Sequence, residues 1–136
     1  MLRCKLENPR ITKMGPIMEI NLYKEDGTKS EYRAAIAPWR ESNFICYRIY
    51  NGEITQSSIG YSGIFPFQKM IKSDMLVKYK KSIIHGQIAI SIIDFIGVIS
   101  NLMGEDILNP EELSLRFMTP ELKTYINLCY KHFKEL

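Results

Sequence analysis

Alternating hydrophobic and polar residues predict strands in the first half of the chain. Two tight-turn signals, Asp26-Gly27 and Asn51-Gly52, separate the alternating stretches, because Gly accepts positive φ without steric cost. Pro38 is expected to end the second stretch, because proline cannot donate a ladder hydrogen bond. Leu2–Leu6 is a candidate for a further edge strand. The four predicted strands are Ile17–Tyr23, Ser30–Ala37, Phe44–Tyr50 and Glu53–Ile59.

Helical spacing of hydrophobic residues replaces this alternation in the second half. A first helix is expected from Phe67 to about Lys78, after Pro66, and a central helix from about Gly86 to Met103, stopped by Gly104. Capping side chains followed by proline and acids predict two further helix starts, at Asn109-Pro110 and Thr119-Pro120. The last helix has the clearest period, at Leu122, Tyr125, Ile126, Cys129, Phe133 and Leu136.

Strands followed by helices indicate an α+β fold. We expect a single domain over residues 1–136, with an antiparallel β-meander of about four strands over 17–60. The helical half, 66–136, should place three to four helices on one face of the sheet.

The isoleucine-rich stretch Ile83–Met103 is about long enough to span a bilayer. It also carries Gln87, Asp94 and Asn101, seven residues apart, which form a narrow polar stripe on a helix. A second set of side chains shares another face: Ile88, Ile92, Phe95, Ile96, Ile99 and Met103. A central helix that is buried on most sides is therefore expected, and no membrane span.

Composition indicates a cytosolic globular protein. The 136 residues are 46% hydrophobic, which argues against disorder, and no apolar leader is visible at the N-terminus. The three cysteines, Cys4, Cys46 and Cys129, are odd in number and widely spaced, so buried reduced thiols are expected. A cytoplasmic location follows as the expectation.

No catalytic, metal or nucleotide motif is present. Three scattered Cys and two distant His, His85 and His132, do not have zinc-ligand spacing, so no metal or cofactor is expected. The loop expected at Gly60–Gly63 lacks the lysine and the spacing of a phosphate-binding loop. Asp94 is the best candidate for a perturbed carboxylate, because it lies in the most apolar stretch.

Charge is unevenly distributed, although 18 basic residues nearly balance 15 acidic ones. Residues 69–81 are basic, whereas Glu105, Asp106, Glu111 and Glu112 form an acidic stretch without a base. The only tryptophan stands in Trp39-Arg40-Glu41, between two predicted strands, and Trp and Arg are enriched at binding hot spots. Solvated helix faces and a Trp folded over the sheet edge are the structural alternatives. A net charge of +3 does not indicate nucleic acid by itself.

The turns and one strand pattern resemble a set of small bacterial α+β proteins. The resemblance rests on Asp26-Gly27, Pro38, Cys46-Tyr47-Arg48-Ile49, Gly60 or Gly63, and Phe67-Gln68. It covers less than half of the chain and consists of turns and packing. Single-domain proteins of this kind also resemble the immunity proteins of contact-dependent and other polymorphic toxin systems. The resemblance implies a cognate toxin as partner and no catalytic residues.

Three function classes therefore stand as hypotheses. The first is an immunity protein that covers a toxin's active site with Trp39, Arg40, Glu41 and the acidic stretch. The slightly basic net charge counts against it where the toxin is a nuclease. The alternative is a small-ligand binder or enzyme with a site near Asp94 and His85. A structural module that forms a homodimer is a third class.

Overall fold

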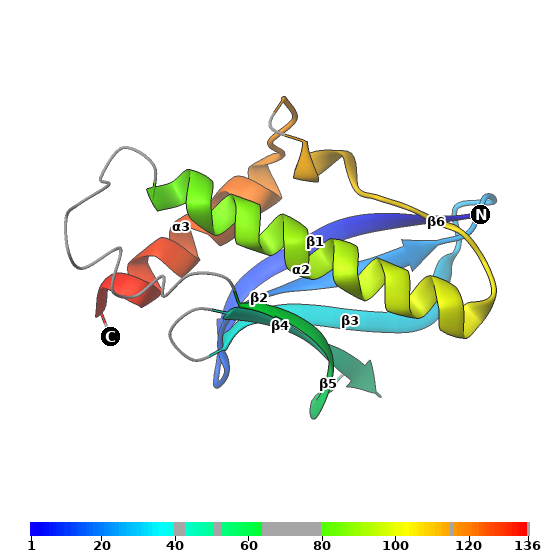
Figure 1. Ribbon diagram of the computed structural model, residues 1–136, viewed down its shortest axis with the longest axis horizontal. Helices are drawn as coiled ribbons and strands as arrows, with labels where there is room; N and C mark the ends of the chain where they lie inside the picture. Colours follow the sequence, from blue (N-terminus) through cyan, green and yellow to red (C-terminus); the bar gives the residue numbers. More distant parts are fainter. Residues whose placement is uncertain (40–42, 51–52, 64–79, 115, 136) are drawn as a thin grey trace.

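A mixed β-sheet with helices on one face makes up the fold (Figure 1). The computed structural model describes residues 1–39, 43–50, 53–63, 80–114 and 116–135. The described elements are β1 Leu2–Thr12, β2 Gly15–Tyr23, β3 Lys29–Trp39, β4 Asn43–Tyr50, β5 Glu53–Gly63, α2 Lys80–Met103, β6 Ile107–Leu108, the 3-10 turn η1 Glu111–Leu113 and α3 Pro120–Glu135. The strand order is β5-β4-β3-β2-β1-β6. The α+β class is confirmed.

The sheet extends the predicted meander by two strands. β1 is a full strand of 11 residues that pairs antiparallel with β2, so the candidate edge strand is longer than expected and lies inside the sheet. β6 pairs parallel with the start of β1, through Leu2 and Arg3. A bulge between Glu7 and Arg10 leaves Asn8 at φ 55°, a left-handed conformation that Asn tolerates better than most residues.

Two sequence expectations about strand ends are wrong. β3 continues through Pro38, which pairs with Phe44 of β4. The register between β3 and β2 ends at Ile36, so the missing N–H of Pro38 falls where only one neighbouring strand is paired. β5 continues to Gly63, so Gly60–Gly63 is strand and not the expected loop.

The helical half differs more from its expectation. Within the described residues there are two α-helices, not three to four, and the helix expected after Asn109 is only the 3-10 turn η1. Its Ncap, Pro110, has no side chain to cap the turn. α2 begins at Lys80, six residues before the expected start, and ends before Gly104 at φ 63°. The helix expected over residues 67–78 lies outside the described residues.

α3 confirms its sequence signals. The Thr119 hydroxyl accepts a hydrogen bond from the Leu122 N–H at 3.3 Å, which caps the helix start. Five of the six periodic positions, Leu122, Tyr125, Ile126, Cys129 and Phe133, are buried, and Leu136 lies outside the described residues. α2 and α3 together cover one face of the sheet, where they enclose the main core with Met18, Ile20 and Leu22 of β2.

α2 passes, by length and composition alone, as a helix able to cross a membrane. The stretch Lys81–Met103 contains an 18-residue window with a mean hydropathy of 1.8, and 50% of that window is buried in the structure. Its expected inner face is confirmed at Ile88, Ile92, Phe95, Ile96 and Ile99, which are buried. It is wrong at Met103, which is 38% exposed at the end of the helix. The polar stripe is not uniform: Gln87 is buried, whereas Asp94 and Asn101 are exposed.

Candidate partner-binding surface

The acids that follow α2 lie at one end of the sheet. The Glu105 carboxylate is 3.0 Å from the Met1 ammonium, and the Asp106 carbonyl accepts the Leu2 N–H at 2.9 Å. Both hydrogen bonds tie the chain after Gly104 to the start of β1. The side chains of Glu105 and Asp106 remain exposed.

Two further acids, distant in sequence, join this end of the sheet. Glu25 and Asp26 belong to the turn between β2 and β3, and with Glu105 they line a groove of about 460 Å³. Lys24 and Met1 also line this groove, and the Met1 ammonium lies 3.7 Å from Glu25. The hydroxyl and the N–H of Thr28 donate to the Asp26 carboxylate and lower its pKa, so Asp26 stays ionised at neutral pH. We call Glu25, Asp26, Glu105 and Asp106 the acidic corner.

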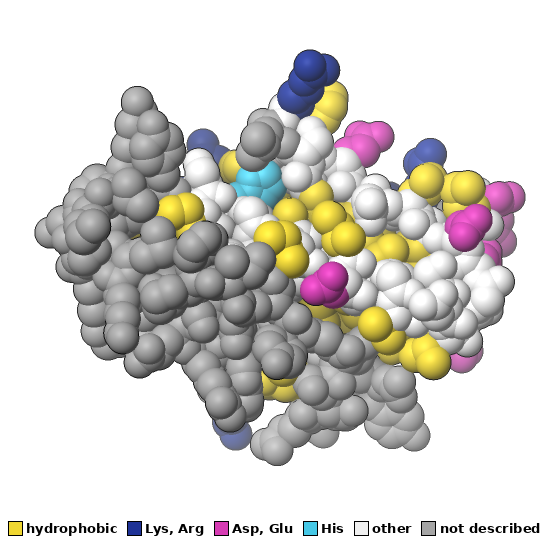
Figure 2. Space-filling model, in the orientation of Figure 1, with side chains coloured by type: hydrophobic (Ala, Val, Ile, Leu, Met, Phe, Trp, Pro, Cys, Tyr) yellow, Lys and Arg dark blue, Asp and Glu magenta, His cyan; other side chains and the backbone are white. Residues whose placement is uncertain are grey.

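Exposed hydrophobic side chains lie on the segment that carries Glu105 and Asp106. Leu102 is 69% exposed, Leu108 is 45% exposed and Met103 is 38% exposed. Figure 2 shows acidic side chains gathered at the end of α2 that leads into residues 104–106, with hydrophobic side chains between them. Hydrophobic contacts with charges at their margin are the usual anatomy of a protein–protein interface.

The other two predicted acids lie elsewhere. Glu111 and Glu112 line a second groove, of about 210 Å³, opposite Arg3 and Lys5 of β1. Their charge is therefore offset by basic side chains of the same groove. The four acids that the sequence placed in one stretch thus divide into two pairs: Glu105 and Asp106 beside the Met1 ammonium, and Glu111 and Glu112 beside Arg3 and Lys5.

The predicted Trp39-Arg40-Glu41 segment does not join the acidic corner. Trp39 ends β3, whereas Lys29 begins β3 close to the Asp26 turn. An extended strand of this length spans about 33 Å, so the two halves of the predicted surface lie at opposite ends of the sheet. Arg40, Glu41 and the side chain of Trp39 lie outside the described part of the chain, as does most of the basic stretch 69–81.

The alternative site does not come together either. Asp94 and His85 are nine residues apart on α2, which places them about 13.5 Å apart along the axis and on opposite sides of the helix. Asp94 is exposed, whereas His85 is 3% exposed. Neither residue lines the grooves described above.

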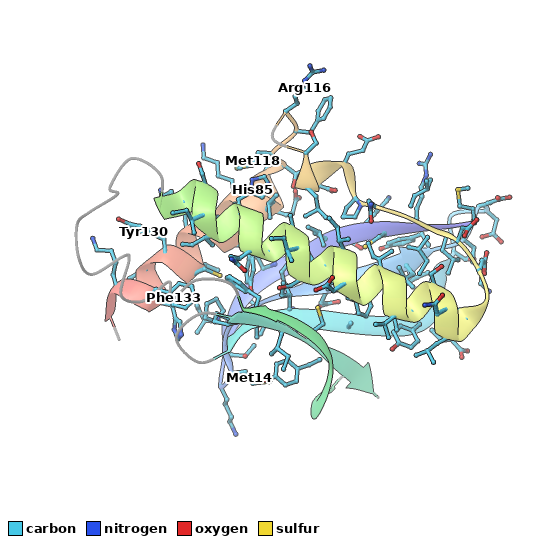
Figure 3. The ribbon with its side chains drawn as sticks, in the orientation of Figure 1. Met14, His85, Arg116, Met118, Tyr130 and Phe133 are labelled. Carbon is cyan, nitrogen blue, oxygen red and sulfur yellow. The ribbon has the colours of Figure 1, made fainter. Side chains whose placement is uncertain are left out.

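His85 is held between α2 and the η1 segment (Figure 3). Burial lowers its pKa, although a hydrogen bond to the Glu112 carbonyl acts in the other direction. The Nε2 atom has no hydrogen-bond partner among the described residues. This environment favours the neutral imidazole, because a proton added at Nε2 would find no hydrogen-bond acceptor among the described residues.

We expect the protein to lose stability below the ordinary His pKa of 6.5. The unfolded chain takes up a proton there that folded His85 resists, so the stabilisation present above pH 6.5 decreases as the pH falls. Urea unfolding at pH 7 and pH 5 measures the loss. The loss should be smaller in His85→Gln, and an equal loss in that variant would assign the effect to other groups.

The three thiols are buried and held in the protonated form. Burial raises the pKa of the Cys4 thiol to about 12 and also raises the pKa of Cys46 and Cys129. Among the described residues, no three His, Cys, Asp or Glu side chains are placed to hold a metal ion.

The sequence did not predict a charge network that lies on the sheet face opposite the helices. The Glu19 carboxylate is 2.7 Å from Arg33 Nη2 and 2.8 Å from Arg10 Nη1, and Asn8 and Asn21 also donate to it. Burial opposes the ionised form of Glu19, but these hydrogen bonds outweigh burial and lower its pKa. The bulge in β1 brings Asn8 to the network. The network ties β1, β2 and β3 together.

No protein-family model, no curated protein and no solved structure matches the chain. Functional inference therefore depends on the surface and on the resemblance in turns and packing.

Proposed function

We propose that this chain is a stoichiometric protein-binding inhibitor, an immunity protein that neutralises a cognate bacterial toxin in the cytoplasm by covering its active site. The observation that supports the proposal is the acidic corner. Three acids from two distant segments, Glu25, Asp26 and Glu105, line one groove there. Asp106 follows Glu105 in the chain, and Leu102, Met103 and Leu108 are exposed on the same segment.

The corner also answers the objection from net charge. The whole chain carries a net charge of +3, but the rate at which a partner associates depends on the electrostatic potential of the surface it approaches. A toxin that acts on nucleic acid needs a basic active site, and an acidic, partly hydrophobic surface is complementary to one. In this proposal Glu25, Asp26, Glu105 and Asp106 contact the toxin, in place of the surface expected at Trp39–Glu41.

The experiment is a binding assay with the product of the adjacent gene. Glu25→Lys/Asp106→Lys should weaken the complex at least tenfold, about 1.4 kcal/mol, and reduce its salt dependence. Both side chains are exposed, so the fold should not change.

Glu111→Lys/Glu121→Lys is the matched control, with the same charge change on exposed acids outside the corner. It should retain most of the affinity. Equal losses in the two double variants would show a non-specific charge effect. Absence of any complex at micromolar concentration would contradict the proposed function.

A further inference from the structure

The outward side of α2 is apolar, although it faces solvent. Ile93 is 49% exposed and Ile90 is 37% exposed. A Cβ added at Gly86 or Gly97 would meet nothing within 4 Å, so the surface beside these two glycines is open. Figure 2 shows hydrophobic side chains along the side of α2 that is turned to the viewer.

These positions follow the spacing of a helix–helix seam. Residues of one narrow face recur at alternating intervals of three and four, which is the heptad pattern by which two helices pack. We call this face the outer seam: Gly86, Ile90, Ile93 and Gly97, all of which are exposed. It is distinct from the inner face that packs on the sheet, which includes Ile84, Ile88, Ile92, Phe95 and Ile99.

We propose that the outer seam pairs with the outer seam of a second copy of this chain, with the two α2 helices antiparallel. The seam is the same when read from either end about its midpoint. Antiparallel pairing then places Ile90 against the partner's Ile93 and Gly86 against the partner's Gly97. A two-fold dimer needs such a self-complementary surface.

The charges at the two ends of α2 favour the same arrangement. α2 begins with Lys80 and Lys81, has no acid in its first turn and no base in its last turn, and is followed by Glu105 and Asp106. This distribution opposes the dipole of a single helix. In an antiparallel pair, each basic end lies beside the partner's acidic end.

Polar residues beside the outer seam favour a second copy of the chain over a lipid bilayer as the partner of this face. Asp94 and Asn101 are exposed directly beside the outer seam. A bilayer would have to cover Asp94, which is costly for a carboxylate. At the rim of a helix pair, the same side chain stays in water.

The first experiment measures the mass of the purified chain by light scattering across a concentration series. A dimer has twice the 15.8 kDa of one chain. Ile93→Asp should raise the dissociation constant at least tenfold, because it places a charge at the centre of the seam. Thr124→Asp, on the exposed face of α3, is the matched control and should leave the dimer unchanged. Circular dichroism should show an unchanged fold in both variants.

Cysteine cross-linking tests the direction of pairing. Antiparallel pairing separates the two copies of position 86 by about 16 Å along the axis but brings position 86 beside the partner's position 97. Gly86→Cys alone and Gly97→Cys alone should therefore stay uncross-linked, whereas an oxidised mixture of the two should form a covalent dimer. The native thiols are buried and should not interfere.

Three results would overturn the proposal. The first is a chain that remains monomeric at concentrations up to about 1 mM. The second is efficient cross-linking of either single variant, which would indicate parallel pairing. The third is a monomer that binds phospholipid vesicles unless Ile93 is replaced, which would assign the seam to a membrane. None of these results involves a toxin, so they are independent of the proposed function.

Discussion

Tyr125→Ala should destabilise the protein by about 3–5 kcal/mol, the usual cost of removing a large aromatic side chain from a core. Tyr125 is fully buried, and its ring lies 6.4 Å from that of Phe44. Its hydroxyl lies 3.0 Å from the Ile36 carbonyl and 3.2 Å from the Pro16 carbonyl, so it connects α3 to β3 and β2. Urea unfolding measures the loss.

Tyr125→Phe separates the ring from the hydroxyl. This variant keeps the packing and leaves two buried carbonyls without the phenol, so it should cost only about 1–2 kcal/mol. Thr124→Ala, at the exposed neighbouring position, should change the free energy of unfolding by less than about 0.5 kcal/mol. Equal losses in the Phe and Ala variants would contradict the role given to the ring.

Glu19→Gln should destabilise the fold by about 2 kcal/mol, because it leaves Arg10 and Arg33 without their shared carboxylate. The loss should be smaller than the roughly 3–5 kcal/mol of a fully buried pair. The two arginine side chains are 43% and 33% exposed, so water can replace part of the lost interaction. The same unfolding assay measures the loss, and Glu31→Gln, an exposed glutamate on β3, is the matched control.

The pH dependence of the stability difference between the wild type and Glu19→Gln provides a second check. The hydrogen bonds lower the folded pKa of Glu19 below the ordinary value of 4.5, so the stabilisation is complete above that value and is lost as the pH falls through the folded pKa. The difference between the wild type and Glu19→Gln should therefore be constant near neutral pH and shrink in acid. A difference that persists unchanged in acid would attribute the loss to packing instead of charge.

Local signals predicted most elements of the fold. Three signals that depend only on neighbouring residues are confirmed. They are the hydrophobic period of α3, the cap of α3 at Thr119 and the end of α2 before Gly104. The expectations for Pro38 and Asn109 failed because each depended on tertiary context. Pro38 is tolerated where β3 pairs on one side, and the chain after Asn109 is held against β1 instead of forming a helix.

The candidate surface was less predictable for the same reason. Glu105 and Asp106 stood out as neighbours in sequence, but their companions Glu25 and Asp26 are about 80 residues away. The two adjacent acids before Gly27 were the available signal. Glu19 gave none, because its alternating position in β2 is that of a solvated residue, and its partners Arg10 and Arg33 become neighbours only in the sheet.

The hydrogen bond between Tyr125 and Pro16 has a consequence for how the chain folds. It joins residues 109 positions apart, and α3 as a whole packs against β1 and β2. The β1–β2 hairpin can form from local contacts, but its apolar face stays uncovered until α3 arrives. Such long loops must close before the core is complete, so folding should be slow for a chain of this size. Until then the hairpin exposes apolar surface through which chains can aggregate.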